Sequence, residues 1–290
     1  MLQRIPMIVF LNGQFVPEEK AVISVFDRGF LYGDGLFEAF RICRGKPFLW
    51  EQHMRRLQQG IDLLKLPMPY TSGQLREHAA ELIRQNEMPD SILRLIISRG
   101  IGARGYSPKG ADHPSVVMSL HPAPVIDPGH PPQWTLITSS VRLPANDPLT
   151  QSKTCNKLSQ VLARSEADAH GANEALLLAT SGEVAEASSS NLFWIEHGTV
   201  CTPPLAGTIL PGVTRAMVLE LCERLNIPAM QTTTTPGKLL QSQGVFLSLS
   251  SWGIVEAVTL DGNNLQRSPL LKPIRDAYNK ALEEHSGLQA

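Results

Sequence analysis

The hydrophobic pattern of the first 121 residues switches between two periodicities. Over residues 50–64 and 72–86, apolar side chains recur every three or four positions, which is the spacing of an amphipathic helix. Apolar runs of strand length occur at residues 7–11, 36–43, 92–98 and 116–120. This mixture predicts a small N-terminal α/β domain, of the α+β kind, over residues 1–121.

Prolines crowd the stretch that follows. The segment HPAPVIDPGHPPQW contains Pro122, Pro124, Pro128, Pro131 and Pro132. Proline lacks a backbone N–H and fixes φ, so this density is incompatible with a helix interior or a central strand. We predict that residues 122–133 form a linker between two domains.

The pattern after the linker again mixes strands with helices. A helix is expected over residues 157–170, with Gly171 at its end, and another over 214–225, just after Gly212. Strands are expected at residues 134–141, 174–179, 192–196, 199–202 and 245–250. Residues 134–290 are therefore predicted to form a larger C-terminal α/β domain, and the small-molecule site is expected in the cleft between the two domains.

Composition and charge narrow the function classes. The chain has 290 residues, 26 basic and 27 acidic, for a net charge of -1, so no overall positive field exists to attract nucleic acid or an anionic membrane. The cysteines are scattered without the spacing of a metal site or a disulfide framework. No apolar run reaches the length of a membrane span, and the N-terminus is typical of a strand with an Asn12-Gly13 turn rather than a signal peptide. These features predict a cytoplasmic protein that binds its ligands at a local site.

Two segments could bind an anion. Gly212 precedes an amphipathic helix, so the amides of Val213 and Thr214 and the Thr214 hydroxyl could hold a phosphate, although a plain N-cap gives the same pattern. Arg56 lies beside the apolar stripe of its predicted helix, where a guanidinium needs an anionic partner. The alternative for Arg56 is a surface ion pair shared with Arg55.

Two further residues could take part in catalysis. Lys153 precedes a predicted helix, where a partly desolvated amine could act as a nucleophile, and Lys157 is the rival candidate one helical turn later. Glu186 precedes small residues, among them Ser189, that could leave room for a flat ring. The alternatives are a solvated lysine and a strand-end glutamate beside a serine-rich turn.

A glycine-rich stretch follows the strand predicted at residues 92–98. Arg99 and Arg104 lie in SRGIGARGYSP, and on a flexible loop they could bind a substrate carboxylate. An ordinary surface loop is the alternative.

Five stretches occur in the order of one enzyme family. They are DRGFLYGDGLFEAFR (27–41), HMRRL (53–57), SKTCNKLSQVLARSEA (152–167), EALLLATSGEVAEASSSNLF (174–193) and TPPLAGTILPGVTR (202–215). With them, the chain resembles the class IV (fold type IV) pyridoxal-phosphate-dependent aminotransferases over nearly its whole length. That family includes D-amino-acid aminotransferase, branched-chain aminotransferase and aminodeoxychorismate lyase. The resemblance implies a two-domain α/β fold, a cofactor in the interdomain cleft and a homodimer.

The resemblance also implies roles for individual residues. Lys153, rather than Lys157, matches the lysine that forms the Schiff base with pyridoxal 5′-phosphate, and Glu186 matches the carboxylate paired with the pyridine nitrogen. The matches to the phosphate contacts are Arg56, Val213, Thr214, Ser250 and Ser251, and Leu210 matches an apolar side chain packed on the ring. Gly212 and Ser189 are expected to adjoin the same cofactor.

The substrate is less clearly indicated. Arg104 matches the arginine that binds the substrate carboxylate in D-amino-acid aminotransferase, whereas Tyr106 replaces that enzyme's histidine and Phe37 its active-site tyrosine. The leading hypothesis is an aminotransferase acting on a small amino acid (or amine) and a 2-oxo acid. The stretch around Arg104 and Tyr106 resembles aminodeoxychorismate lyase, which releases 4-aminobenzoate and pyruvate for folate synthesis and is the second hypothesis. The third is a phosphate-ligand binding protein without catalysis.

Overall fold

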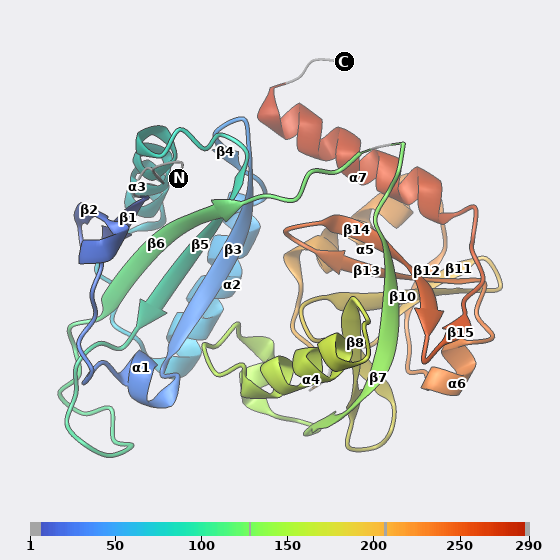
Figure 1. Ribbon diagram of the computed structural model, residues 1–290, viewed down its shortest axis with the longest axis horizontal. Coiled ribbons are helices and arrows are strands. Elements are labelled where there is room, and N and C mark those ends of the chain that lie inside the picture. The colour runs from blue at the N-terminus through green and yellow to red at the C-terminus, as the bar shows by residue number, and fades with distance from the viewer. Residues whose placement is uncertain (1–6, 128, 206–207, 288–290) are drawn as a thin grey trace. The chain divides into compact units, whose positions relative to one another are not determined.

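The computed structural model describes residues 7–127, 129–205 and 208–287, and the chain divides into two compact units (Figure 1). The first comprises Met1–Ala123, Ser152–Asn156 and Glu283–Ala290, and the second comprises Pro124–Gln151 and Lys157–Leu282. Each unit contains a β-sheet with helices packed on it, so the predicted mixed α/β architecture is confirmed. No pattern along the chain indicated that residues 152–156 would join the first unit.

The first unit is an antiparallel sheet with the strand order β2-β1-β6-β5-β3-β4. Its strands are β1 (Ile8–Leu11), β2 (Gln14–Pro17), β3 (Gly35–Cys43), β4 (Lys46–Pro47), β5 (Ser91–Ser98) and β6 (Ser115–Pro122), and its helices are α1 (Arg28–Tyr32), α2 (Trp50–Leu64) and α3 (Ser72–Gln85), with a 3-10 turn at Glu18–Lys20. Asn12 and Gly13 both have positive φ and close the β1–β2 hairpin, as the Asn-Gly pair predicts. Strand β6 runs through Pro122, which pairs with Ser91, so the regular structure extends one residue into the predicted linker.

Helices α2 and α3 pack on one face of this sheet, and α2 runs behind β3 and β5 in Figure 1. The core contains Leu57 and Ile61 from α2, Leu82 from α3, and Phe40 and Leu95 from the sheet, all nearly inaccessible to solvent. Helix α3 begins at a capping box in which Thr71 and Gln74 bond each other's backbone N–H. Side chains alternate between the two faces of a strand, so every second residue of β3 points toward α2.

The second unit has the strand order β12-β11-β10-β13-β14-β7-β8-β9, with β15 beside β14. Its strands are β7 (Gln133–Leu143), β8 (Glu174–Ala179), β9 (Val184–Ala187), β10 (Asn191–Glu196), β11 (Thr199–Thr202), β12 (Ala229–Gln231), β13 (Gly244–Leu249), β14 (Gly253–Leu260) and β15 (Asn263–Asn264). The helices are α4 (Leu158–Ala169), α5 (Val213–Arg224), α6 (Pro236–Leu239) and α7 (Leu271–Ser286), whose last residues belong to the first unit, and a 3-10 turn spans Pro148–Gln151. Strand β7 is parallel to both β8 and β14, and it thereby joins the two halves of the sheet.

Most of the predicted elements are confirmed within one or two residues. The sequence analysis missed β14 and α7, among other elements. Strand β14 is buried along most of its length in the middle of the sheet, and its identity as a strand depends on β13 and β7 at its two edges. Among the described residues, no helix combines the length and the apolar character that a membrane crossing requires.

Candidate active site

Lys153 lies on a short segment that pairs with the edge of β3. The Phe37 N–H donates to the Lys153 carbonyl at 2.9 Å, and the Cys155 N–H donates to the Gly35 carbonyl at 2.9 Å. Thr154 forms an antiparallel bridge with Leu36. The backbone on both sides of Lys153 is therefore fixed by the sheet, even though more than a hundred residues separate the two segments in sequence.

The side chain of Lys153 is half-buried against an aromatic face. Its Nζ lies 4.6 Å from the centre of the Phe37 ring, and the Arg94 guanidinium lies 4.2 Å from the same ring centre. Phe37, which the sequence analysis matched to an active-site tyrosine of the family, lies in contact with the predicted cofactor lysine. Lysine and arginine cations are attracted to such a ring, which thus helps to fix the direction of the amine.

A buried polar cluster lies on the other face of β3, between the strand and α2. The Glu38 carboxylate accepts from Arg56 Nε at 2.8 Å, from Arg56 Nη2 at 2.6 Å, and contacts His53 Nδ1 at 2.8 Å. Glu38 is 0% exposed, His53 2% and Arg56 7%. His53 and Arg56 are three positions apart on α2 and therefore share the helix face that looks onto the strand.

The ionisation of this cluster follows from its burial and its charges. Burial by itself would raise the pKa of Glu38, but the charge of Arg56 and the hydrogen bonds from His53 and Arg56 outweigh it and lower the pKa to about 2. Burial lowers the pKa of His53, the Glu38 carboxylate opposes this, and the charges of Arg56 and Lys153 add to it. The cluster therefore holds an ionised Glu38, a cationic Arg56 and a neutral His53 near pH 7.

The sequence analysis missed Glu38 and His53 as site residues. A signal was present, because Glu38 occupies a position of β3 at which the alternation calls for an apolar side chain. A carboxylate at such a position is rarely buried without a partner. Arg56, by contrast, was correctly predicted to lie beside the apolar stripe, and the alternative of a surface ion pair is excluded by its burial.

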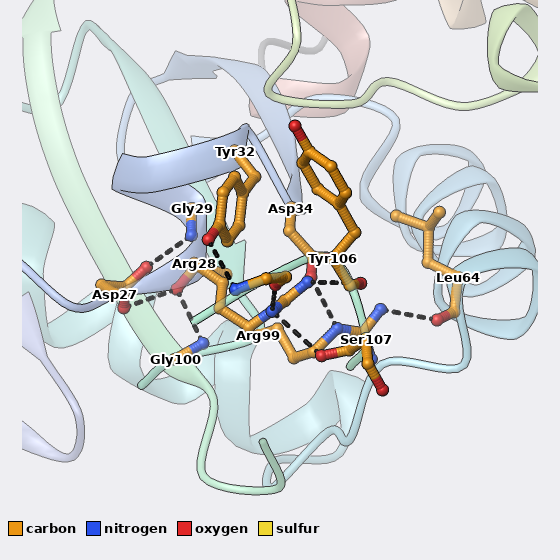
Figure 2. Close-up of polar contacts among 12 residues, drawn as sticks. Asp27, Arg28, Gly29, Tyr32, Asp34, Leu64, Arg99, Gly100, Tyr106 and Ser107 are labelled. Atoms are coloured by element: carbon orange, nitrogen blue, oxygen red, sulfur yellow. Dashed lines mark hydrogen bonds and ion pairs between the residues drawn. The ribbon is translucent and has the colours of Figure 1, made fainter. Parts of the chain in front are cut away.

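Arg99 directly follows β5 and is buried, and its polar contacts are drawn in Figure 2. Its Nε donates to Asp34 Oδ2 at 2.8 Å, and its two terminal nitrogens donate to the carbonyls of Leu64 and Lys65 at 2.8 and 3.1 Å. Those bonds tie the end of β5 to the end of α2. The first arginine of the predicted loop is therefore buried and held by the Asp34 carboxylate and by two carbonyls.

Arg104 and Tyr106 lie on the exposed part of the same stretch. Arg104 is exposed, and 87% of the Tyr106 surface is accessible. The Tyr106 ring packs edge-on against Tyr32 of α1 at 5.5 Å between ring centres. Both side chains are thus accessible from solvent, and their role as substrate contacts stays a prediction.

In the second unit, Glu186 is held by its neighbours on β10 and on the segment before α5. Its carboxylate accepts from the Leu210 N–H at 2.9 Å and from Asn191 Nδ2 at 3.3 Å. Asn191 Nδ2 also donates to the Leu210 carbonyl at 2.9 Å. The structure therefore bonds two predicted cofactor residues, Glu186 and Leu210, directly to each other, and Asn191, which the sequence analysis did not single out, bonds to both.

The start of α5 is built around Gly212. This residue is the N-cap of the helix, and Val213 and Thr214 form its buried first turn. A Cβ on Gly212 would lie 1.8 Å from Asn191 Oδ1, so no larger residue fits there without moving Asn191. A glycine N-cap has no side chain to bond the first amides of the helix, and such a helix start favours an anion.

The three predicted serines fall in two places. Ser189 donates from its N–H and its Oγ to Glu174 Oε2, at 3.2 and 2.5 Å, and Ser188 donates to the other oxygen of Glu174. Ser250 and Ser251 are half-buried in the turn between β13 and β14. The bonds of Ser189 thus hold it to the buried carboxylate at the start of β8, and they give it a structural role.

Comparisons with known proteins show which family the chain matches. The family model for amino-transferase class IV matches residues 35–259. A Methanocaldococcus jannaschii protein provisionally named a branched-chain-amino-acid aminotransferase is 32% identical over 275 residues, which cover 94% of this chain and 95% of that protein. The D-alanine aminotransferase of Staphylococcus aureus is 29% identical over 287 residues, covering 96% of this chain and 99% of the relative.

Solved structures are similar to the chain over nearly its whole length. A branched-chain amino acid aminotransferase from T.th., complexed with N-(5′-phosphopyridoxyl)-L-glutamate, is 27% identical with a TM-score of 0.88, and the match covers 98% of this chain and 96% of that one. The 4-amino-4-deoxychorismate lyase of Pseudomonas aeruginosa is 31% identical with a TM-score of 0.82, over 94% of this chain and 98% of that one.

Proposed function

The chain belongs to the class IV aminotransferase family, and from this premise we propose that it binds pyridoxal 5′-phosphate on Lys153 and transfers an amino group between a small amino acid and a 2-oxo acid. The observation that carries the proposal is the position of Lys153. The strand pairing with Phe37 and Gly35 fixes its backbone, and its half-buried amine lies against an aromatic ring. A lysine that only solubilises the surface needs neither feature.

Each unit, taken by itself, contains residues that suit part of a phosphate-bearing aromatic cofactor. In the first unit, Arg56 supplies a buried guanidinium whose plane is set by Glu38. In the second, Gly212 is the N-cap of α5 and has no side chain to bond the first amides of the helix, and a Cβ there would lie 1.8 Å from Asn191 Oδ1. We assign the phosphate to Arg56, to the amides of Val213 and Thr214, and to Ser250 and Ser251.

Glu186 and Leu210 would hold the ring of the cofactor. The Leu210 N–H and the Asn191 amide fix the Glu186 carboxylate, so it can keep a pyridine nitrogen protonated without itself moving. Pyridoxal phosphate, when bound, supplies a ring that withdraws the electron pair left when the substrate's α proton departs. The Lys153 amine would carry that proton between the α carbon of the substrate and C4′ of the cofactor.

The substrate would meet the exposed side chains of Arg104 and Tyr106. A guanidinium binds a carboxylate through two parallel hydrogen bonds, which suits the α-carboxylate of an amino acid. Arg99 is not proposed as a substrate contact, because its guanidinium already donates to Asp34 and to the carbonyls of Leu64 and Lys65.

A specific observation favours aminodeoxychorismate lyase as the second candidate. The Arg104-Gly105-Tyr106 stretch resembles that enzyme, and the lyase of Pseudomonas aeruginosa is 31% identical over almost the whole chain. The lyase reaction would use the same Lys153 and the same ring contacts, and only the fate of the substrate would differ.

The test is to assay the purified enzyme with a panel of D- and L-amino donors and pyruvate or 2-oxoglutarate, alongside release of 4-aminobenzoate from aminodeoxychorismate. We expect turnover with at least one donor, a cofactor absorbance band at the edge of the visible, and, after borohydride reduction, a phosphopyridoxyl group on the Lys153 peptide. Lys153→Ala should lower kcat at least about 10³-fold.

Lys157→Ala is the matched control, because Lys157 lies four residues away as the N-cap of α4. It should keep the absorbance band and most of the activity. Product only in the 4-aminobenzoate assay would select the lyase. A wild-type protein with no cofactor band, and equal behaviour of Lys153→Ala and the wild type, would refute the proposal and leave a binding protein.

We also propose that the enzyme is a homodimer. Large apolar side chains are exposed before and within α1, where Val22 is 74%, Phe26 63% and Phe30 72% accessible. A second copy of the chain would cover such a patch. Analytical ultracentrifugation should give about twice the mass of one chain, and Phe30→Lys should shift the distribution toward the monomer.

A further inference from the structure

Arg28, the first residue of α1, is a buried cation bound to a distant loop. Its Nη1 donates to the carbonyls of Gly105 and Ser107 at 2.9 and 3.1 Å, and its Nη2 donates to the carbonyl of Tyr106 at 3.0 Å (Figure 2). Only 3% of Arg28 is exposed. One guanidinium therefore holds three consecutive carbonyls of a loop 77 to 79 residues further along the chain.

Asp34 fixes the direction of this guanidinium. Asp34 Oδ2 accepts from Arg28 Nε and from Arg99 Nε, both at 2.8 Å. Arg99 is itself anchored to the carbonyls of Leu64 and Lys65. A carboxylate between two anchored guanidiniums leaves Arg28 little freedom to turn, so its terminal nitrogens stay aimed at the loop.

The amide side of the loop is held as well. The Gly105 N–H donates to Tyr32 Oη at 3.1 Å, and the Arg28 guanidinium lies 5.0 Å from the centre of the Tyr32 ring. Gly105 has a φ of 109°, a conformation that other residues rarely adopt. Donor and acceptor groups of the loop are thus both satisfied from α1.

The start of α1 is itself bonded to the sheet. Asp27, the N-cap of α1, accepts from the Gly29 N–H at 2.7 Å and from the hydroxyls of Ser98 and Ser115 at 2.8 and 2.7 Å. A Cβ on Gly29 would lie 2.5 Å from Ser98 Cβ, so α1 sits directly on the end of β5. Helix α1 is short, and these contacts rather than its own turns keep it in place.

The same end of β3 also holds the segment of the cofactor lysine. Asp34 immediately precedes Gly35, whose carbonyl accepts from the Cys155 N–H two residues after Lys153. The N-terminal end of β3 therefore contacts both Arg28, which holds the loop, and the segment that contains Lys153. A change in Asp34 would disturb both.

We propose that Arg28, Asp34 and Tyr32 are positioning residues that hold residues 104–107 in one shape, so that Arg104 and Tyr106 meet the substrate on a preformed surface. The effect on substrate binding rests on the proposed function, whereas the ordering of the loop by Arg28, Tyr32 and Asp34 does not. A loop whose backbone groups are bonded before substrate arrives does not have to be ordered on binding, and the entropy lost on binding is smaller.

The first measurement is backbone amide exchange in the purified holoenzyme, followed by mass spectrometry of the peptides that cover residues 101–110. We expect the Gly105 amide to be protected in the wild type. Arg28→Lys keeps the charge but not the planar fork, and it should speed exchange across residues 105–107 at least about tenfold. Trypsin should cut after Arg104 faster in this variant by a similar factor.

The second measurement is kinetic. Arg28→Lys should raise the KM of the amino donor about tenfold while kcat changes less than about threefold, with the cofactor band unchanged. Tyr32→Phe is the milder variant, and it should deprotect the Gly105 amide alone. Arg44→Lys changes an exposed arginine of the same unit and should behave as the wild type in every assay.

The outcomes separate this inference from the proposed function. Suppose the protein has no turnover, but its Gly105 amide is protected and Arg28→Lys speeds exchange in residues 105–107. That result would refute the proposed function and support the positioning role of Arg28. An active enzyme whose Gly105 amide is unprotected, or whose KM and loop exchange are unmoved in both Arg28→Lys and Tyr32→Phe, would overturn the inference. If Arg28→Lys does not fold, Tyr32→Phe decides.

Discussion

The Glu38 carboxylate and the Arg56 guanidinium form a two-point ion pair in the interior of the first unit, with Nε at 2.8 Å from Oε1 and Nη2 at 2.6 Å from Oε2. Two parallel bonds fix the plane of a guanidinium as well as its position. Arg56 is therefore oriented before any ligand arrives, and Glu38 is the residue that orients it.

Removing the charge of Glu38 should destabilise the protein strongly. Glu38→Gln leaves the Arg56 cation buried without its counter-ion, and breaking a buried pair in this way typically costs about 3–5 kcal/mol. Urea unfolding measures the loss, and titration with pyridoxal phosphate should show weaker binding. Glu51→Gln is the control, since its contact with Arg76 is exposed and 3.6 Å long, and it should change stability by less than about 1 kcal/mol.

The stability of the protein should fall in two steps as the pH is lowered. His53 has a lowered pKa in the fold, so below its ordinary value of 6.5 the unfolded chain binds a proton that the folded chain does not, and stability declines. The pKa of Glu38 is lowered from 4.5 to about 2, so its contribution is complete above pH 4.5 and is lost as the pH falls toward 2. That second step amounts to about 3 kcal/mol.

Urea unfolding at a series of pH values measures both steps. His53→Gln should flatten the curve around pH 6 and leave the step below pH 4.5. An unchanged slope near pH 6 in this variant would show that folding does not lower the pKa of His53, and it would contradict the prediction.

Adding one methyl group at Gly212 should damage the cofactor site of the second unit. The new Cβ of Gly212→Ala would lie 1.8 Å from Asn191 Oδ1, so Asn191 must move and loosen its hold on Glu186 and Leu210. Such overpacking costs about 1–3 kcal/mol, and the dissociation constant for pyridoxal phosphate should rise about tenfold or more. Gly237→Ala, which has open space around it in α6, should leave both quantities unchanged.

The cysteines should differ in their reaction with a thiol reagent. Burial raises the pKa of Cys222 to about 11 and also raises the pKa of Cys201. At pH 8 the thiolate fraction of Cys222 would be about 10⁻³, which makes it almost inert. Cys43 and Cys155 are half-buried and should be labelled first. Labelling in 8 M urea, where all sites are exposed, is the control; equal rates in the folded protein would contradict the expected burial.

Local pattern was enough to identify many of the elements. The apolar spacing of residues 50–64 predicted α2 with its observed bounds, and the run 174–179 predicted β8. The glycine before residues 214–225 correctly indicated where α5 begins. These predictions succeed because helix and strand periodicity, capping and glycine conformation are properties of neighbouring residues.

The order of the motifs likewise carried the family assignment, which the comparisons confirm. The residue roles stay predictions, although the structure brings Glu186 next to Leu210 and places Lys153 against Phe37. The residues beside Arg99 and Ser189 in the sequence did not predict that Arg99 would bond Asp34 or that Ser189 would bond Glu174.

By itself, the sequence determined the kind of each strong element and the family to which the chain belongs. Only the tertiary structure decided that Lys153 lies beside β3, that Glu38 orients Arg56, and that Arg28 holds the backbone of residues 105–107. Each of these contacts joins segments that are far apart along the chain or on different elements. Which buried charge meets which partner depends on how the sheet and helices pack, because a buried ion is stable only where packing supplies its counter-ion and its hydrogen bonds.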